Sequence, residues 1–283
     1  MANITTLKLD IQFNNRLGGL LNALKSIAAQ QYQALERVLR SNPVFFDAIH
    51  TIAAGLELRR VAHPFTDGGE PIGVIAVTSD TGLLGGLNQQ VISVALQEFR
   101  QAPGELMVVG ERGVAAVKDA KLSCTAFPGA SDHGRRALAS RVCDYALSLA
   151  LAGRIRSLTI VHPRSLSFTL QRIEVIRVLP CTSWLRTAGR APSIGPAALL
   201  VLESPLAGLI EYLVWLWLGE KLVDVLGSSR LAELGARSIH LEGSSQELQR
   251  RGKKLMLRYF RERRELIDRN IRELFAAKSL YGR

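Results

Sequence analysis

The stretch TSDTGLLGGLNQQ, residues 78–90, joins an apolar run to a predicted helix through a turn that contains three glycines. The run before it, PIGVIAVT at residues 71–78, is short and rich in β-branched residues, which is typical of a buried strand. A glycine-rich turn between a strand and a helix raises the question of a phosphate-binding loop. The answer separates a nucleotide-binding enzyme from proteins of other classes.

Neither common phosphate-binding pattern fits this turn. A Walker loop requires Lys after its last glycine, and no Lys follows the glycines here. A dinucleotide fingerprint requires G-x-G-x-x-G, which the spacing of Gly82, Gly85 and Gly86 does not match. We therefore interpret the turn as structural, because its glycines permit a sharp bend and Ser79 or Asn88 can satisfy exposed backbone amides. The residues assigned to this structural turn are Ser79, Asp80, Gly82, Gly85, Gly86 and Asn88.

Apolar, β-branched runs alternate with helical stretches on both sides of the turn. The predicted strands lie at residues 71–78, 105–110, 122–127, 157–163 and 167–180, and the predicted helices at 88–100, 111–118 and 134–152. Strands that alternate with helices favour a mainly parallel sheet. Residues 70–181 are therefore predicted to form a Rossmann-like α/β domain.

The N-terminal region, residues 1–60, is predicted to be helical. Asn42 and Pro43 interrupt the pattern, and they suit the cap and the first position of a second helix. The apolar residues that recur at spacings of three and four, and so are predicted to share one helix face, are Leu17, Leu20, Leu21, Leu24, Ile27, Ala28, Leu35 and Val38.

The C-terminal region, residues 197–283, is predicted to be helical as well. No proline follows the sequence GSS at residues 227–229, and Gly235, Gly243 and Gly252 are the weak points of this helix. Its predicted apolar face consists of Leu248, Leu255, Tyr259, Leu266, Ile267, Ile271 and Leu274. The fold class is therefore α/β with long helices: the N- and C-terminal helices form an antiparallel two-helix coiled coil that brackets the central domain.

Composition and spacing exclude several classes of site. The three cysteines are widely spaced, and the five histidines show no metal-ligand spacing. No cofactor site, metal site or catalytic residue is predicted. The first residues have neither a secretory apolar core nor a transit-peptide composition, which indicates a bacterial-type cytoplasm. The apolar segment 194–219 contains Pro196 and Pro205, so we expect it to pack against protein rather than to span a membrane.

Charge supplies the strongest remaining signal. The formal net charge is +11, and eight of the 15 residues from Arg250 to Arg264 are Lys or Arg. Like charges at helical spacings repel, so this run favours an acidic partner. Tyr259 and Phe260 lie among the cations, which also fits single-stranded nucleic acid. A basic nucleic-acid-binding protein therefore stays as one alternative function, and an α/β nucleotide-binding enzyme as the other.

Together these residues resemble the gamma subunit of F-type ATP synthases. The turn is similar to that family's S-D-x-G-L-x-G-G-L-N signature, through Ser79, Asp80, Gly82, Leu83, Gly85, Gly86, Leu87 and Asn88. The sequence AELGARS resembles the family's Ala-Ala-Arg-Met run at Ala236 and Arg237, and RELIDRNIREL resembles its terminal helix, with Arg263, Ile267 and Glu273 in register. Upstream, Arg37, Ser41 and Pro43 are similar to its Arg-x-x-x-Ser-x-Pro motif.

The chain also departs from the family pattern. Thr81 and Leu84 stand where the family usually has Arg and Cys inside the glycine signature. The N-terminal helix loses most of the family's polar pattern, and the helix before Gly227 is unusually rich in Leu and Trp. The resemblance is therefore to a divergent member, such as one from an alternative ion-translocating ATPase.

The resemblance implies a non-catalytic rotor shaft that couples ion-driven rotation, by protons or sodium, to ATP synthesis or hydrolysis. Its implied partners are the alpha and beta subunits of the catalytic ring, the epsilon subunit and the membrane ring of c subunits, and no nucleic acid is expected. The implied location is peripheral, at the cytoplasmic face of the bacterial inner membrane. The implied ring contacts are Arg237, Arg263, Arg264, Asp268, Ile267, Ile271 and Leu274.

Overall fold

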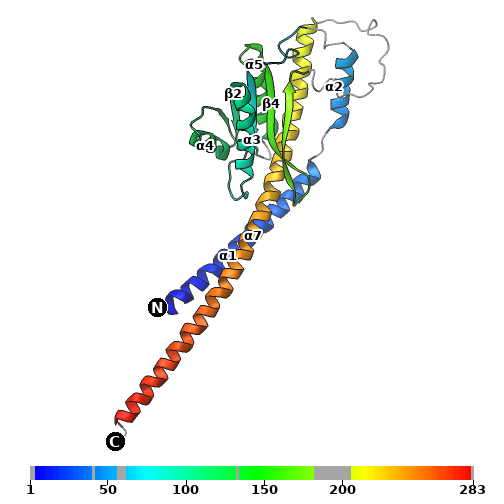
Figure 1. Cartoon of the computed structure of the whole chain (residues 1–283). Helices are drawn as coiled ribbons and strands as arrows, with labels where there is room; N and C mark the ends of the chain where they lie inside the picture. Colours follow the sequence, from blue (N-terminus) through cyan, green and yellow to red (C-terminus); the bar gives the residue numbers. More distant parts are fainter. Residues whose placement is uncertain (1–3, 40–41, 56–61, 132–133, 182–204, 282–283) are drawn as a thin grey trace. The chain divides into compact units, whose positions relative to one another are not determined.

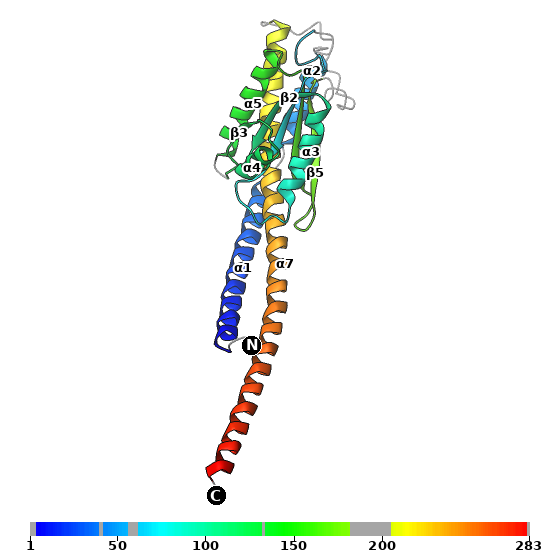
Figure 2. The ribbon, with the colours of Figure 1, turned by 60° about the vertical axis from the view of Figure 1, so that its left-hand side comes forward.

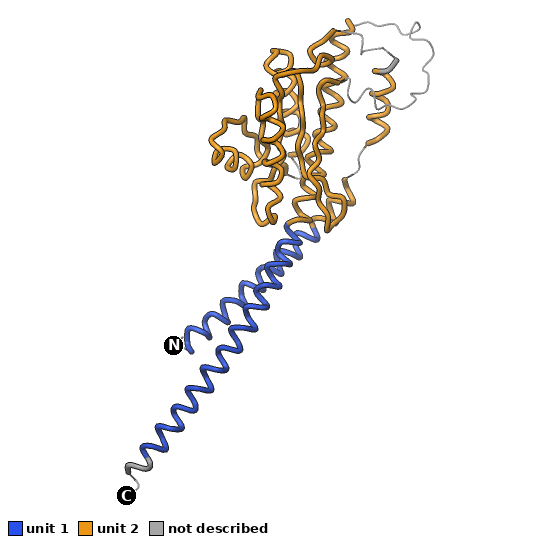
Figure 3. The backbone as a smooth tube through the Cα atoms, in the orientation of Figure 1, with its two compact units in different colours: residues 1–30, 237–283 blue, residues 31–236 orange. Residues whose placement is uncertain are grey.

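The computed structural model of the chain describes residues 4–39, 42–55, 62–131, 134–181 and 205–281. These residues form two compact units (Figure 3): unit 1 comprises residues 1–30 and 237–283, and unit 2 comprises residues 31–236. Ser41 and Pro196, which entered the sequence predictions, lie outside the described residues, as do segments 56–61 and 182–204 of the predicted domains and linker.

Unit 2 is built on a five-stranded sheet of order β3-β2-β1-β4-β5 (Figure 1). The strands are β1 (Ile72–Val77), β2 (Pro103–Val109), β3 (Thr125–Phe127), β4 (Ser157–Ser165) and β5 (Gln171–Leu179). β1 pairs in parallel with β2 and β4, β2 pairs in parallel with β3, and β5 alone runs antiparallel, against β4. The predicted mainly parallel α/β fold is confirmed.

Helices cover both faces of the sheet (Figures 1 and 2). They are α2 (Pro43–Gly55), α3 (Leu87–Gln101), α4 (Glu111–Asp119) and α5 (Arg135–Leu151), together with the first part of α7 (Leu206–Tyr281). Successive strand residues point to opposite faces. Val74 and Ala76 accordingly belong to the core beneath α3 and α4, whereas Ile75 and Val77 belong to the core shared with α2, α5 and α7.

The predicted third strand is shorter than expected. Residues 122–127 were predicted to be extended, but β3 begins at Thr125. Lys121 adopts a left-handed φ of 57°, and the Leu122 amide donates to the Val117 carbonyl at 3.2 Å. Residues 121 and 122 therefore cap the C-terminal end of α4, and the first part of the predicted strand belongs to this cap.

The helix α7 is one continuous element of 76 residues. The helix continues through the GSS sequence at 227–229, which precedes the predicted proline-free stretch. It also continues through Gly235, Gly243 and Gly252. The expectation that the segment beginning at 206 packs against protein is confirmed, since Ile210, Leu213, Val214, Trp217 and Leu218 are buried in the main core. No helix among the described residues is long and apolar enough to cross a membrane.

The N-terminal region forms two helices, α1 (Ile4–Val38) and α2. Pro43 is the first residue of α2, and the Asn42 side-chain oxygen accepts a hydrogen bond from the Phe45 amide at 3.3 Å. The predicted cap is therefore confirmed. It satisfies one of the amides that every helix leaves without a partner in its first turn.

Unit 1 is an antiparallel pair formed by α1 and α7, called the arm below. Lys25 Nζ donates to Glu242 Oε2 at 2.6 Å, and Ser245 Oγ donates to Asn22 Oδ1 at 3.0 Å. The partner number on α7 thus falls as the number on α1 rises. The predicted antiparallel two-helix pairing is confirmed.

The predicted apolar faces of the arm helices are wrong in part. Leu20 and Ile27 of α1 are exposed, as is Val38 in unit 2, while the buried α1 residues include Asn14 and Tyr32. On α7, Leu255 is buried, but Leu266, Ile267, Ile271 and Leu274 are exposed. Spacings of three and four do not distinguish a face against another helix from a second apolar face that points outward.

His162 on β4 is a buried titratable group beside α7. Its Nδ1 lies 3.2 Å from the Pro163 carbonyl, which selects the tautomer that carries the proton on Nδ1. Its Nε2 is buried without a hydrogen-bond partner, 3.7 Å from Glu174 Oε2. Burial lowers the pKa of His162 to about 4; Glu174 opposes the shift, and Lys221 and Arg164 add to it.

This histidine predicts a loss of stability in acid. The unfolded chain binds the proton near pH 6.5 and the folded chain only near pH 4, so stability present above pH 6.5 is lost as the pH falls between these values. The loss should approach roughly 3 kcal/mol. Thermal unfolding of the wild-type chain and of the His162→Gln variant from pH 7.5 to 4.5 measures it, since glutamine does not titrate. Parallel pH profiles of the two proteins would contradict this assignment.

Candidate functional site

The glycine-rich turn between β1 and α3 adopts a left-handed backbone at three positions. Gly85 and Gly86 have φ values of 60° and 93°, and Leu83 between the glycines has a φ of 65°. Gly86 is the residue that precedes the first turn of α3. Glycine reaches this region without steric cost, whereas Leu83 adopts it at a cost of roughly 1 kcal/mol. The surrounding contacts therefore have to hold the turn in place.

Asp80 supplies the first of these contacts. Its Oδ1 accepts hydrogen bonds from the amide of Glu111, the first residue of α4, and from the amide of Gly129, both at 2.9 Å. A carboxylate is favourable at a helix N-terminus because it meets unpaired amides and the positive end of the helix dipole. A Cβ atom at Gly129 would lie 2.6 Å from the Asp80 carboxylate, so a larger residue there would displace that carboxylate.

Asn88 and Ser79 close the turn from its two ends. Asn88 Nδ2 donates to Ser79 Oγ at 2.9 Å, and the Ser79 amide donates to Asn88 Oδ1 at 3.3 Å. Ser79 Oγ in turn donates to the Thr81 carbonyl at 2.7 Å. These polar side chains join the end of β1 to the start of α3.

The turn also binds α7 through a buried carboxylate. Glu233 is 7% exposed, and its Oε1 accepts from Thr81 Oγ1 at 3.1 Å and from Arg230 Nη1 at 2.7 Å. Leu84 and Leu87 of the turn pack with Ala236 in a small apolar cluster. The turn therefore connects β1, α3, α4 and α7.

The turn does not form a nucleotide cradle. The cavity beside it, lined by Ser79, Leu84 and Glu233 among others, has a volume of about 10 Å³. Small-molecule sites usually enclose about 300–1,000 Å³. The described residues contain no group of three or more His, Cys, Asp or Glu side chains arranged to hold a metal ion.

The second candidate surface is the outside of the arm. Every α7 residue from 263 to 277 is exposed, because no described residue of α1 lies against this stretch. Arg263, Arg264 and Asp268 are exposed there, and Arg237 is half-buried nearer the start of the arm. Ile267, Ile271 and Leu274 follow one another at helical spacing on a single face, with Leu274 70% exposed.

The outer face of α1 is apolar too. Leu9, Phe13, Leu20 and Ile27 are exposed and fall within about 40° of one another around the helix at 100° per residue. The arm thus presents large apolar side chains from both of its helices. The eight cations between Arg250 and Arg264 are all exposed on the same arm.

Some of these residues were not predicted from the sequence. Glu233 was missed, although it is the sole acid in residues 225–241 and lies in an apolar helical stretch, which is a usable signal for a buried polar contact. Thr81 was noted as a departure from the signature without a role. Asn14 and Gly252 were also missed, because their contact joins positions 238 residues apart in the sequence.

The chain resembles known proteins over almost its whole length. The family model described as ATP synthase matches residues 3–279. An ATP synthase gamma chain of Clostridium beijerinckii is 23% identical over 282 residues, and one of Clostridium pasteurianum 25% over 280, with 96% of each chain covered in both cases. The rotor of the Euglena gracilis mitochondrial ATP synthase contains a chain of the same fold, with a TM-score of 0.68 at 15% identity over 93% of this chain and 98% of that one.

The contacts of Asp80 predict that the turn depends on its carboxylate. The Asp80→Ala variant should lower the free energy of unfolding by about 1–3 kcal/mol, since two backbone amides lose a charged acceptor. Asp80→Asn keeps one acceptor oxygen and should lose about half as much. Thermal unfolding measures both, with the exposed Asp119→Asn as the control of equal charge change. An Asp80→Ala protein as stable as the wild type would refute the role.

Proposed function

The chain belongs to the ATP synthase gamma-chain family, and from that membership we propose that it is the central rotor shaft of an F-type ATP synthase. The arm supplies the observation that carries the proposal. Both helices expose large apolar side chains: Phe13 on α1, and Leu274 and Phe275 on the part of α7 that extends past α1. Such surfaces are unfavourable in water and are typical of a segment enclosed by partners.

The proposed enclosing partners are the alpha and beta subunits of the catalytic ring. Ile267, Ile271 and Leu274 provide non-directional apolar contacts, which tolerate rotation because they do not depend on a fixed hydrogen-bond geometry. Arg237, Arg263, Arg264 and Asp268 provide the polar contacts. The basic run from Arg250 to Arg264 faces acidic groups of the ring, which relieves the repulsion among its own cations.

The shaft acts on the catalytic sites by differential contact. A rotor that touches three equivalent sites with three different faces stabilises a different conformation at each of them. Moving one site from 1:99 to 99:1 requires about 5.5 kcal/mol of differential interaction. Burying two or three large apolar side chains supplies that much, at about 1.5–3 kcal/mol each. Leu274 and Phe275 are exposed side chains of this kind.

Unit 2 is proposed to contact the epsilon subunit and the membrane ring of c subunits, at the cytoplasmic face of the bacterial inner membrane. It offers a fixed aromatic surface: Tyr212 and Trp215 on α7 are exposed and stacked, with ring centroids 6.3 Å apart. Trp215 Nε1 donates to Asp144 Oδ1 at 2.8 Å, which holds the indole against α5. Fixed, exposed Trp and Tyr side chains are typical of protein interfaces.

The two alternative functions account for less of the structure. The turn leaves no space for a nucleotide, which argues against an α/β nucleotide-binding enzyme. The basic run alone fits a nucleic-acid-binding protein. However, that function gives no reason for the large exposed apolar side chains of both arm helices, and it predicts a steep salt dependence that a shaft does not require.

Native mass spectrometry of the chain co-expressed with alpha and beta subunits from the same source tests the proposal directly. The expected mass is that of a complex with three alpha subunits, three beta subunits and a single copy of this chain. An alpha–beta assembly that forms without the chain, under conditions in which all three are soluble, would exclude the shaft function.

Charge reversal tests the proposed polar contacts. The Arg263→Glu, Arg264→Glu double variant should lower assembly or the ATPase rate of the complex by about tenfold or more, because like charges placed opposite each other cost several kcal/mol. Arg100→Glu, Arg141→Glu makes the same change of charge at two exposed arginines of unit 2 and should retain assembly and activity. Unchanged assembly and ATPase activity of the arm variant would rule out these contacts.

A further inference from the structure

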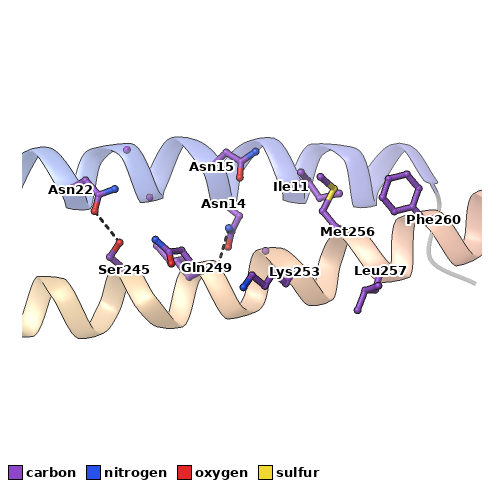
Figure 4. A pocket seen from close by; sticks show the side chains of 14 residues that line it. Ile11, Asn14, Asn15, Asn22, Ser245, Gln249, Lys253, Met256, Leu257 and Phe260 are labelled. Atoms are coloured by element: carbon purple, nitrogen blue, oxygen red, sulfur yellow. Dashed lines mark hydrogen bonds between the residues drawn. The ribbon is translucent and has the colours of Figure 1, made fainter.

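The side chains most deeply buried at the centre of the arm are polar. Leu7 and Ala28 of α1 are buried, and between them the structure, which describes this whole stretch, buries only Asn14. Between Leu241 and Leu255 of α7, equally described throughout, it buries only Ser245. A groove of about 770 Å³ runs beside these residues (Figure 4). The apolar residues between these positions on both helices are at most half-buried.

Asn14 makes the most position-specific contact in this interior. Its Nδ2 donates to the Leu248 carbonyl at 3.1 Å, as Figure 4 shows, although that carbonyl belongs to the backbone of a continuous helix. The amide reaches the backbone because residue 252, one turn further along α7, is glycine. A Cβ atom at Gly252 would lie 2.9 Å from Asn14 Nδ2. Asn14 and Gly252 therefore fit each other as a pair.

Gly252 is the one glycine of the α7 arm segment whose missing Cβ faces α1. The other glycine of that segment, Gly243, has no atom within 4 Å of the position of a Cβ. If α1 shifted along α7, Asn14 would therefore meet side chains of α7 and could not reach a backbone carbonyl beside a glycine. Two further polar pairs, Asn22 with Ser245 and Lys25 with Glu242, follow in the same register.

We propose that Asn14 and Gly252 form a register lock that fixes the axial position of α1 on α7. Apolar side chains in a two-helix seam are interchangeable, so neighbouring registers differ little in free energy. A buried polar residue at one seam position removes that degeneracy at a cost in stability, because its hydrogen bond forms in one register only. Asn14 Oδ1, which is buried without a partner, shows that this cost is present here.

The lock concerns the helix pair itself and does not depend on the proposed partners. It also determines which outer side chains of α1 lie beside the basic run of α7. A slip by one turn would move every α1 residue by about 5.4 Å along α7. The arm would then present a different surface, even with both helices intact.

Disulfide trapping in the full chain measures the register. In the native register, Asn22→Cys lies against Ser245→Cys; after a slip by one turn it lies against Gln249→Cys instead. The half-buried Cys124 is replaced by Ser. Cys143 and Cys181 are retained, because burial raises their pKa values to about 12 and about 11 and neither forms a thiolate near pH 7.

Oxidation of intact cells, followed by mass spectrometry of the disulfide-linked peptides, gives the ratio of the two crosslinks without requiring a soluble isolated chain. With the lock intact, the native crosslink should exceed the slipped one by about tenfold or more. Gly252→Ala and Asn14→Leu should each lower that ratio by about tenfold, since each removes the same hydrogen bond.

Matched variants separate the lock from general effects on the helices. Gly243→Ala makes the same substitution in α7 without meeting α1, and Asn15→Leu makes the same change beside Asn14 at an exposed site. Both should leave the ratio unchanged. In the double variant Asn14→Leu, Gly252→Ala the ratio should fall no further than in either single variant, because the two residues act as one unit.

A ratio that stays the same in Gly252→Ala and Asn14→Leu would overturn the lock. An equal fall in Gly243→Ala would overturn it as well, since helix propensity rather than the contact would then set the register. Neither result depends on ring assembly. A failure of the shaft proposal in native mass spectrometry therefore leaves this test intact.

Discussion

The packing of α7 is the constraint on which both units depend. The helix has 76 residues and includes six glycines, each of which costs about 1 kcal/mol relative to alanine. Intrinsic propensity does not sustain such a helix, so tertiary contacts have to. In unit 2 the sheet core supplies them through buried residues from Ile210 to Leu226, and the glycine-rich turn adds the Glu233 carboxylate. Leu39 packs closely against Gly227, and the Phe168 carbonyl lies close to Gly235. Glycine therefore occurs where a neighbouring segment approaches the helix closely.

The sequence predicted the elements of unit 2 well because its signals are local. Strands such as Ile72–Val77 are short β-branched runs, and each has a turn residue beside it, so periodicity and turn chemistry agree. The errors have a common physical cause. The outward position of Leu20 and the register contact of Asn14 are both decided by what packs against the helix. The residues that pack against a helix are distant in the sequence, so the residues next to each position do not reveal them. Residues 263, 264 and 268 were placed by family register, and their contacts with a ring stay predictions.

The glycine signature shows how the same residues serve structure without chemistry. Three backbone positions in the left-handed region and a carboxylate at a helix N-terminus are features that phosphate sites also use. Here Asp80 itself occupies the amides of Glu111 and Gly129, so the anion is part of the chain. The space that a ligand would need is filled by Leu84, Leu87 and the polar contacts to Glu233. The turn therefore joins the sheet to α7 through these contacts.

The arm buries polar side chains at its centre and exposes large apolar ones. Asn14 and Ser245 are buried between the helices, whereas Phe13 on α1 is exposed, as are Leu274 and Phe275 in the part of α7 that extends past α1. Alone in water this arrangement is unfavourable on both counts, since buried polar groups give up hydration and exposed apolar groups are hydrated poorly. Inside a protein collar the same arrangement separates two tasks. In the proposed assembly, directional hydrogen bonds at the centre hold the two helices at one register, and non-directional apolar contacts at the surface let the pair turn against the ring. A shaft needs both, because torque passes only through an arm whose helices do not slide on each other.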